Sequence, residues 1–315
     1  MIRKIIIDTD PGIDDAMAIL FAHKATEIEV LGLTTTFGNV PVAKATENAL
    51  ILNSIAGVDV PVAEGVAVPL EITPRPHPDF VHGKDGFGNI NWPATDKKAL
   101  GITAAQFIVD NVRKYPGEVT IVALGPLGNL AMALELDPEI AHLVDEVVLM
   151  GGTHLEYGNV SPVAEANIIN DPHAADKVFT AEWQVTMIGL DVTHQVLLDN
   201  TVLERIKQAN PVQGDFLYQA AQHYINFYSD RFNMKGCYFH DASTIAYVMQ
   251  PDLFGIELGA IRVACDGVAI GQTIVSPEGM SFPEPAWDNV PNTQVCMEVN
   301  SDALLSLFEK TLTAS

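Results

Sequence analysis

The chain has 315 residues, of which 48% are hydrophobic and 18% are charged, so it can bury a large core. Its 17 lysines and arginines face 40 aspartates and glutamates, and the net charge of −23 disfavours nucleic acid and anionic membranes as partners. A neutral or cationic small molecule is the better candidate ligand, although such a charge can also serve solubility alone.

The cysteines and the apolar runs indicate in which cellular compartment the protein is expected. Cys237, Cys265 and Cys296 form no Cys-x-x-Cys pair and are expected to be buried, reduced thiols. No apolar signal core follows Met1, and no uninterrupted apolar run reaches the ~18 residues of a membrane span. These features predict a cytoplasmic protein with no membrane partner.

Four aspartates follow the first predicted strand. The apolar run 5–7 is typical of a buried parallel strand, Pro11 and Gly12 turn the chain, and a helix is predicted from Ile13. A helix amino terminus favours each nearby acid by only ~0.3–1 kcal/mol, which does not offset several like charges in a buried place. The acids are Asp8, Asp10, Asp14 and Asp15.

A bound cation is the missing component of this cluster. Carboxylate oxygens without nearby Cys or His suit Ca²⁺ or Mg²⁺ better than zinc. The run is not an EF-hand loop, because its sixth position is Ile13 and its twelfth is Ile19, and Gly12 does not fit an aspartyl phosphatase. The alternative is that Asp14 and Asp15 only begin a helix while Asp8 bonds to backbone amides.

Strands and helices then alternate, which predicts an open, mostly parallel α/β sheet with helices on both faces and one domain over 1–315. Ligands of such sheets lie at the carboxyl ends of the strands, so Asn39 is expected near Asp10, unless it is only a turn residue. Another predicted strand ends at the run 125–131, and backbone carbonyls at such a point are suitable ligands for a hard cation. Strands are predicted over 30–36, 60–63, 119–124, 144–150 and 185–194, and a helix over 45–56.

Two irregular stretches offer polar side chains to a ligand. The Pro- and Gly-rich stretch 73–95 is predicted to be a lid or binding loop that holds a ligand through His82, Phe87, Asn89 and Trp92, unless it is an ordinary surface loop. The stretch 157–172 is predicted to be irregular up to a helix that starts at Pro172.

The second stretch groups Asn159, Glu165 and Asn167, whose amides and carboxylate suit sugar hydroxyls. The alternative is that Asn170 and Asp171 cap the helix while the other side chains pair with loop backbone.

A mostly helical tract is predicted to about Tyr228, and after residues 229–239 comes the pair His240-Asp241. Asp241 begins a predicted helix and can be a cap, and His240 is expected to titrate near neutrality. The pair matters for function if it folds back onto Asp10. Strands over 261–264 and 294–299 and a helix from about 302 complete the prediction.

The segment 8–16, DTDPGIDDA, resembles the amino-terminal signature of the inosine/uridine-preferring nucleoside hydrolases. Further matching blocks follow in order at 34–39, 82–83, 123–131, 147–152, 159, 163–171, 185–193 and 240–241. The resemblance implies an open α/β fold, one Ca²⁺, a role in nucleoside salvage and a homotetramer. The implied Ca²⁺ ligands are Asp10, Asp15, the Leu124 carbonyl and Asp241.

The resemblance also implies roles on the substrate. It places Asp14, Asn167 and Asp241 on the ribose 2′- and 3′-hydroxyls, and Asn159 and Glu165 on the 5′-hydroxyl. Asn39 is implied near the ribose, His82 in the substrate loop, and His240 with Tyr228 as the proton donor to the leaving base.

This arrangement agrees with the chemistry of N-glycosidic hydrolysis, which builds positive charge on the sugar and negative charge on the base. Asp10 is placed to take a proton from water. His240 favours a branch acting on uridine, cytidine and inosine over the purine-specific branch, while Ala166, in place of a Phe of some relatives, puts base selectivity in doubt. The alternative function is a non-catalytic, Ca²⁺-dependent ribose or nucleoside sensor, which would not need His240.

Overall fold

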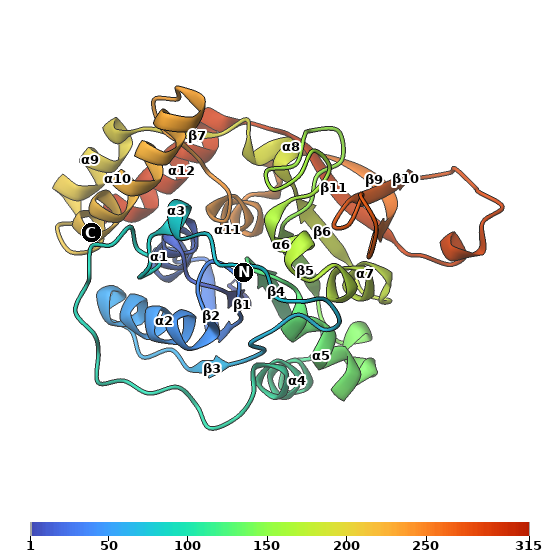
Figure 1. Cartoon of the computed structure of the whole chain (residues 1–315). Helices are drawn as coiled ribbons and strands as arrows, with labels where there is room; N and C mark the ends of the chain where they lie inside the picture. Colours follow the sequence, from blue (N-terminus) through green and yellow to red (C-terminus); the bar gives the residue numbers. More distant parts are fainter. Residues whose placement is uncertain (1, 315) are drawn as a thin grey trace.

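The computed structural model describes residues 2–314, and a nine-stranded sheet forms its centre (Figure 1). The strand order is β10-β9-β11-β6-β5-β4-β1-β2-β3. The strands are β1 (Arg3–Thr9), β2 (Ile28–Thr35), β3 (Val62–Glu64), β4 (Val119–Ala123), β5 (Glu146–Met150), β6 (Val185–Ile188), β9 (Phe254–Val263), β10 (Thr273–Pro277) and β11 (Asn292–Val299).

The strands from β3 to β11 in this order are parallel to their neighbours, and β9 and β10 add an antiparallel edge. The predicted mostly parallel α/β fold is therefore confirmed. Strand β10 was not predicted, and β9 is longer than the expected 261–264. A separate two-stranded pair joins β7 (Leu197–Leu198) and β8 (Cys237–Tyr238).

Helices cover both faces of the sheet, because alternate residues of each strand point to opposite sides. Ile5 and Ile7 pack in one hydrophobic cluster, and Ile6 packs in the other. The first cluster includes residues of α1 (Ile13–Lys24), α2 (Val42–Ala56), α9 (Asn200–Ala209), α10 (Gln213–Phe232), α11 (Ala242–Met249) and α12 (Ser301–Thr313). The second includes residues of α4 (Ala104–Lys114), α5 (Gly128–Leu136) and α7 (Pro172–Thr180).

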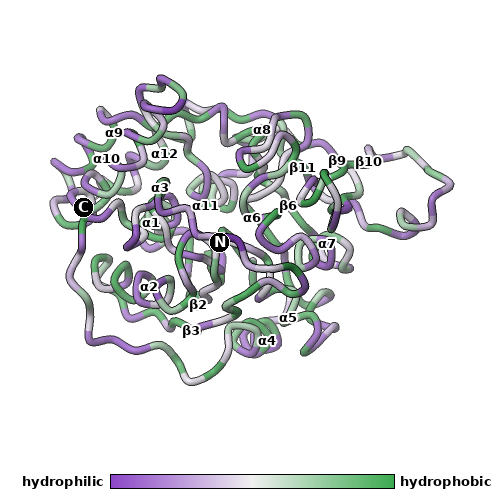
Figure 2. Tube along the Cα trace, viewed as in Figure 1, coloured by the Kyte–Doolittle hydropathy of each residue, from purple (hydrophilic) through white to green (hydrophobic). Residues whose placement is uncertain are grey.

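Short helices mark several connections: α3 (Asp79–His82), α6 (Ala166–Asn170) and α8 (Leu190–Thr193), with 3-10 turns at Pro138–His142, Pro251–Leu253 and Pro285–Trp287. Helix α10 continues to Phe232, beyond the predicted end near Tyr228. The connection from β3 to α4 is otherwise irregular, as predicted, and its outer part is largely hydrophilic (Figure 2). Among residues 2–314, no helix combines the length and apolarity needed to cross a bilayer.

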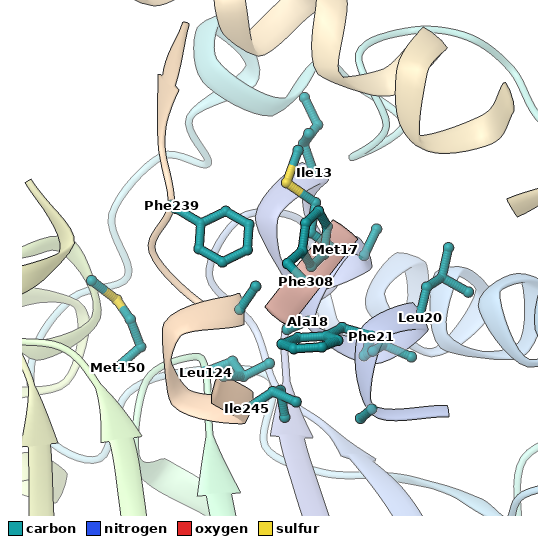
Figure 3. Packing of buried hydrophobic residues seen from close by; sticks show 14 of the residues in the cluster. Ile13, Met17, Ala18, Leu20, Phe21, Leu124, Met150, Phe239, Ile245 and Phe308 are labelled. Carbon is teal, nitrogen blue, oxygen red and sulfur yellow. The ribbon is translucent and has the colours of Figure 1, made fainter. Parts of the chain in front are cut away.

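Helix α1 is the central helix of the molecule, because every residue from Ile13 to Ala22 is buried. Phe21 packs on Phe308 of α12 at 5.2 Å between ring centroids, and Phe308 packs on Phe239 at 4.8 Å. Figure 3 shows these rings with Met17 beside the start of α11. Helix α11 thus packs against α1, and Asp241 at its start lies close to Asp14 and Asp15 at the amino-terminal end of α1.

Candidate functional site

The strand order places a site beside β1. The chain proceeds from β1 to β2 and β3 on one side and then returns to β4 on the other, so the carboxyl ends of β1 and β4 border a switch point of the sheet. Ligands of open α/β sheets bind in the crevice at such points. Asp10 follows β1 and Leu124 follows β4, and the two strand ends are joined by the Leu124 N–H, which donates to the Asp8 carbonyl at 2.7 Å.

Two glycines allow the loops after β2 and β4 to close on Asp10. A Cβ at Gly38 would lie 2.0 Å from Asp10 Oδ2, and one at Gly125 would lie 2.5 Å from Oδ1. Any side chain at either position would therefore displace the carboxylate. The Asn39 N–H donates to Asp10 Oδ2 at 2.6 Å, and the Asn39 Nδ2 donates to Asp15 Oδ2 at 3.0 Å. Asn39 thus binds two of the acids and is more than a turn residue.

The acids of the first turn are buried together. Asp10 and Asp15 are fully buried, and Asp14 is 8% exposed. Asp15 is the best satisfied, since it accepts from Thr9 Oγ1 at 2.5 Å and from the Gly12 N–H at 2.9 Å. Asp14 Oδ2 accepts from the Tyr224 hydroxyl at 3.2 Å.

Asp241 joins this cluster from far along the chain. Carboxylate oxygens of Asp14, Asp15 and Asp241 lie within 4.8 Å of one another. Asp241 begins α11, but its side chain makes no capping hydrogen bond, so the capping alternative does not account for it. The resemblance implied Asp10 rather than Asp14 among the metal ligands, whereas this group contains Asp14 and lacks Asp10.

The donor set fits a hard cation. Asp10 Oδ1, Asp14 Oδ1 and Asp241 Oδ2 are buried oxygens with no hydrogen-bond partner. Within residues 2–314, no lysine or arginine forms an ion pair with these acids. Unpaired buried carboxylates are costly, and oxygen-only ligands suit Ca²⁺ or Mg²⁺.

The pKa values reflect this uncompensated burial. Burial raises the pKa of Asp14 from 3.8 to about 6. Burial, and then the neighbouring negative charges, raise the pKa of Asp10 and of Asp241 well above 3.8. Asp8 lies in β1, two residues before Asp10. Burial raises its pKa to about 7, although Thr34 and Asn129 donate hydrogen bonds to its Oδ1.

The connection between β5 and α7 supplies the predicted sugar-binding side chains. Glu165 caps α6, and Asn167 lies inside this short helix, so the chain is less irregular than predicted. Glu165 Oε2 accepts from the backbone N–H of Gly152 at 3.0 Å and of Asn167 at 2.9 Å. Asn159 Oδ1 accepts from the Ala166 N–H at 3.0 Å. The alternative interpretation therefore holds in part, because Asp171 caps α7 while Glu165 and Asn159 pair with backbone.

Each of these three side chains keeps one polar atom that could bind a ligand. Among the described residues, Glu165 Oε1, Asn159 Nδ2 and Asn167 Oδ1 have no hydrogen-bond partner. Asn167 Nδ2 donates to the carbonyl of Leu124 at 2.7 Å and of Met150 at 3.0 Å, which turns its amide toward the end of β4. Burial raises the pKa of Glu165 to about 7.

His240 belongs to a chain of hydrogen bonds that reaches Asp14. Its Nε2 lies 3.0 Å from the Tyr228 hydroxyl, which donates to the Tyr224 hydroxyl at 3.4 Å, and Tyr224 contacts Asp14 as described. His240 Nδ1 lies 2.8 Å from Thr193 Oγ1. Burial lowers the pKa of His240 well below 6.5, contrary to the expected titration near neutrality.

Sequence reasoning missed Tyr224 and Thr193. Tyr224 and Tyr228 are four residues apart, so they share a face of α10, and this spacing was the available signal. Thr193 gives no comparable local signal.

His82 contacts the first turn of α1. Its Nδ1 accepts from the Ile13 N–H at 3.3 Å and lies 3.7 Å from Asp14 Oδ1. Burial lowers the pKa of His82 to about 4. A ring nitrogen that accepts a hydrogen bond carries no proton, so we interpret the His82–Asp14 approach as a neutral contact and not as an ion pair.

The other residues expected to hold a ligand from this loop are structural. Phe87 and Trp92 each pack on Phe216 of α10 at 5.0 Å between centroids. Asn89 Oδ1 accepts from the Lys84 N–H at 2.8 Å. Only His82, of the side chains predicted there, reaches the acids of the first turn.

Comparison with known proteins shows similarity to nucleoside hydrolases over nearly the whole chain. The family model described as inosine-uridine preferring nucleoside hydrolase matches residues 5–306. A probable uridine nucleosidase 2 of Arabidopsis thaliana is 42% identical over 97% of this chain and 96% of its own length. An inosine-uridine preferring nucleoside hydrolase of Crithidia fasciculata is 41% identical over 98% and 96%.

Solved structures show the same fold. The plant nucleoside hydrolase PpNRh1 superposes with a TM-score of 0.95 at 41% identity, covering 99% of both chains. A purine-preferring ribonucleoside hydrolase from Gardnerella vaginalis superposes with a TM-score of 0.92 at 33% identity, covering 99% of this chain and 98% of that one. The chain belongs to the inosine-uridine preferring nucleoside hydrolase family.

Proposed function

We propose that this enzyme hydrolyses ribonucleosides of the uridine, cytidine and inosine class to ribose and free base with the help of a bound Ca²⁺. The observation that carries the proposal is the buried group of aspartates with unpartnered oxygens at the switch point of the sheet. The names of the relatives, uridine nucleosidase and inosine-uridine preferring nucleoside hydrolase, support the substrate class.

The proposed ligands of Ca²⁺ are Asp10, Asp15, Asp241 and the Leu124 carbonyl. When bound, the ion supplies positive charge that orders vicinal hydroxyls and lowers the pKa of a bound water. Asp10 then acts as the general base, because its Oδ1 has no hydrogen-bond partner. Asn39 holds Asp10 in place through its N–H.

Polar side chains hold the ribose. Asp14, Asn167 and Asp241 bind the 2′- and 3′-hydroxyls, while Glu165 and Asn159 bind the 5′-hydroxyl through the atoms that the backbone leaves free. Carboxylate and amide oxygens around the sugar stabilise the positive charge that develops as the glycosidic bond breaks. His82 completes this side of the site beside Asp14.

The Tyr228–His240 pair supplies the proton to the leaving base. Burial keeps the His240 ring neutral in the free enzyme, and the hydroxyls of Thr193 and Tyr228 fix its orientation at both nitrogens. As negative charge develops on the base, the pair passes a proton from solvent water to the base, and the proton that Asp10 takes from the attacking water returns to solvent. General acid catalysis of this kind contributes about 10²–10⁴-fold.

The test is His240→Ala, with His142→Ala as the control because that side chain is 63% exposed and distant in the fold. We expect turnover of inosine to fall by about 10²-fold or more while ribose binding, measured by calorimetry, changes little. Unchanged turnover would remove the proposed role of His240.

Release of free ribose from uridine, cytidine, inosine and adenosine measures the base preference. Binding of these nucleosides without any release of ribose would favour the Ca²⁺-dependent sensor. The homotetramer, the cytoplasmic location and the salvage role are proposed on the family resemblance alone, and light scattering measures the first of these.

A further inference from the structure

Asn48 connects the acidic turn to the loop that carries His82. It lies in α2 and is 2% exposed. Its Nδ2 donates to the Pro11 carbonyl at 2.9 Å and to the Asp85 carbonyl at 2.9 Å. Pro11 follows Asp10 directly, and Asp85 lies three residues beyond His82, so one buried amide spans the two segments.

The loop after His82 is folded by its own contacts. The carboxylate of Asp85 accepts from the backbone N–H groups of Phe87, Asn89 and Asn91 at 2.8–2.9 Å. Phe87 is 2% exposed and packs on α10. Residues 85–91 therefore hold their own conformation through these hydrogen bonds. Their position in the fold is set by contacts with neighbouring segments.

That unit is in direct contact with Asn48 and with the acidic turn. A Cβ at Gly86 would lie 2.5 Å from Asn48 Nδ2 and 2.8 Å from the Pro11 carbonyl oxygen, and Gly86 has φ +83°. On the other side of the unit, a Cβ at Gly88 would lie 2.7 Å from His223 Cβ. The loop thus lies between the turn and α10, and Asn48 donates one hydrogen bond to the turn and one to the loop.

We propose that Asn48 is a positioning residue that fixes the His82 loop against the Asp10–Asp15 turn, so that substrate binding depends on its two hydrogen bonds. Loss of the amide leaves the buried carbonyl of Pro11 and the half-buried carbonyl of Asp85 unpaired, which favours separation of the two segments. The effect on the substrate rests on the proposed function. The effect on the loop does not.

The experiment compares Asn48→Leu with Asn53→Leu. Asn53 lies on the same helix, is fully buried and donates to the Val60 carbonyl at 2.8 Å, away from the acids. Both variants lose a buried amide of the same size, but only the first removes contacts of the His82 loop. Tryptic cleavage after the exposed Lys84, identified by mass spectrometry, reports the loop, and steady-state kinetics with inosine report the site.

We expect Asn48→Leu to be cleaved at Lys84 about tenfold faster than Asn53→Leu and to raise KM about tenfold with a smaller change in kcat. Equal cleavage rates, or a KM like that of Asn53→Leu, overturn the proposal. If Asn48→Leu does not fold, Asn48→Ser, which keeps one donor, must lie between the wild type and Asn48→Ala in both measurements. An unchanged Lys84 rate overturns the proposal even if the protein hydrolyses no nucleoside, which separates this failure from failure of the proposed function.

Discussion

Without the proposed Ca²⁺, the stability of this protein should depend on pH with a definite sign. The pKa of Asp14 is raised from 3.8 to about 6, and the same direction holds for Asp10, Asp15 and Asp241. For Asp14 alone, this difference corresponds to roughly 3 kcal/mol of destabilisation when the carboxyl is ionised at neutral pH. Because the native state binds protons that the unfolded state has released, the free energy of unfolding falls as pH rises from about 4 to about 7.

A bound cation should offset the destabilisation that the ionised, buried carboxylates cause. Calcium at 100 times its dissociation constant stabilises a protein by about 2.7 kcal/mol. We therefore expect the midpoint of thermal unfolding at pH 7.5 to be several degrees higher in Ca²⁺ than in EDTA. In EDTA the midpoint should rise as the pH is lowered to 5.5, and the difference between the two buffers should shrink.

The matched variant is Asp241→Asn. It removes one charge from the acidic group at nearly constant volume, so the metal-free variant should unfold at a higher temperature than the metal-free wild type. The variant should also lose most of the response to Ca²⁺. A wild type whose unfolding midpoint is the same in Ca²⁺, Mg²⁺ and EDTA at pH 7.5 would refute the reasoning, because the buried acids would then need no cation.

Two further substitutions test the hydrogen-bond chain and the loop. Tyr224→Phe removes the hydroxyl that donates to Asp14, and we expect kcat for inosine to fall while the free energy of unfolding changes by only about 1 kcal/mol. An unchanged kcat would show that the Tyr228–His240 pair works without this link. Phe87→Ala removes a buried ring that packs on Phe216, and urea unfolding should show a loss of about 3–5 kcal/mol. A loss below 1 kcal/mol would return Phe87 to the class of ligand-binding candidates.

The sequence predicted those features that depend on neighbouring residues. The apolar run before Asp8, the Pro11-Gly12 turn and the buried helix after it gave the order of β1 and α1, since strand and helix patterns are local. The parallel sheet followed from repetition of that pattern. Strand β10 was missed because Ile274 and Val275 are its only adjacent apolar residues, and Pro277 ends it.

The remaining features depend on packing between distant segments. Whether Asp241 caps its helix or faces the acids depends on Phe239 and Phe308, which lie on different elements. Phe87 and Trp92 were assigned to a ligand because nothing in a Gly- and Pro-rich loop indicates that its aromatic residues will pack on Phe216. The low pKa of His240 likewise reflects complete burial, which composition alone does not reveal.

The burial of α1 on every side restricts how this enzyme can be redesigned. No residue from Ile13 to Ala22 faces solvent, so a change of size anywhere along this helix shifts packing throughout the core. The direction of the Asp14 and Asp15 side chains therefore cannot be changed by substitutions in their own helix without disturbing the core. Under the proposed function, new substrate preferences therefore have to come from loops outside this helix.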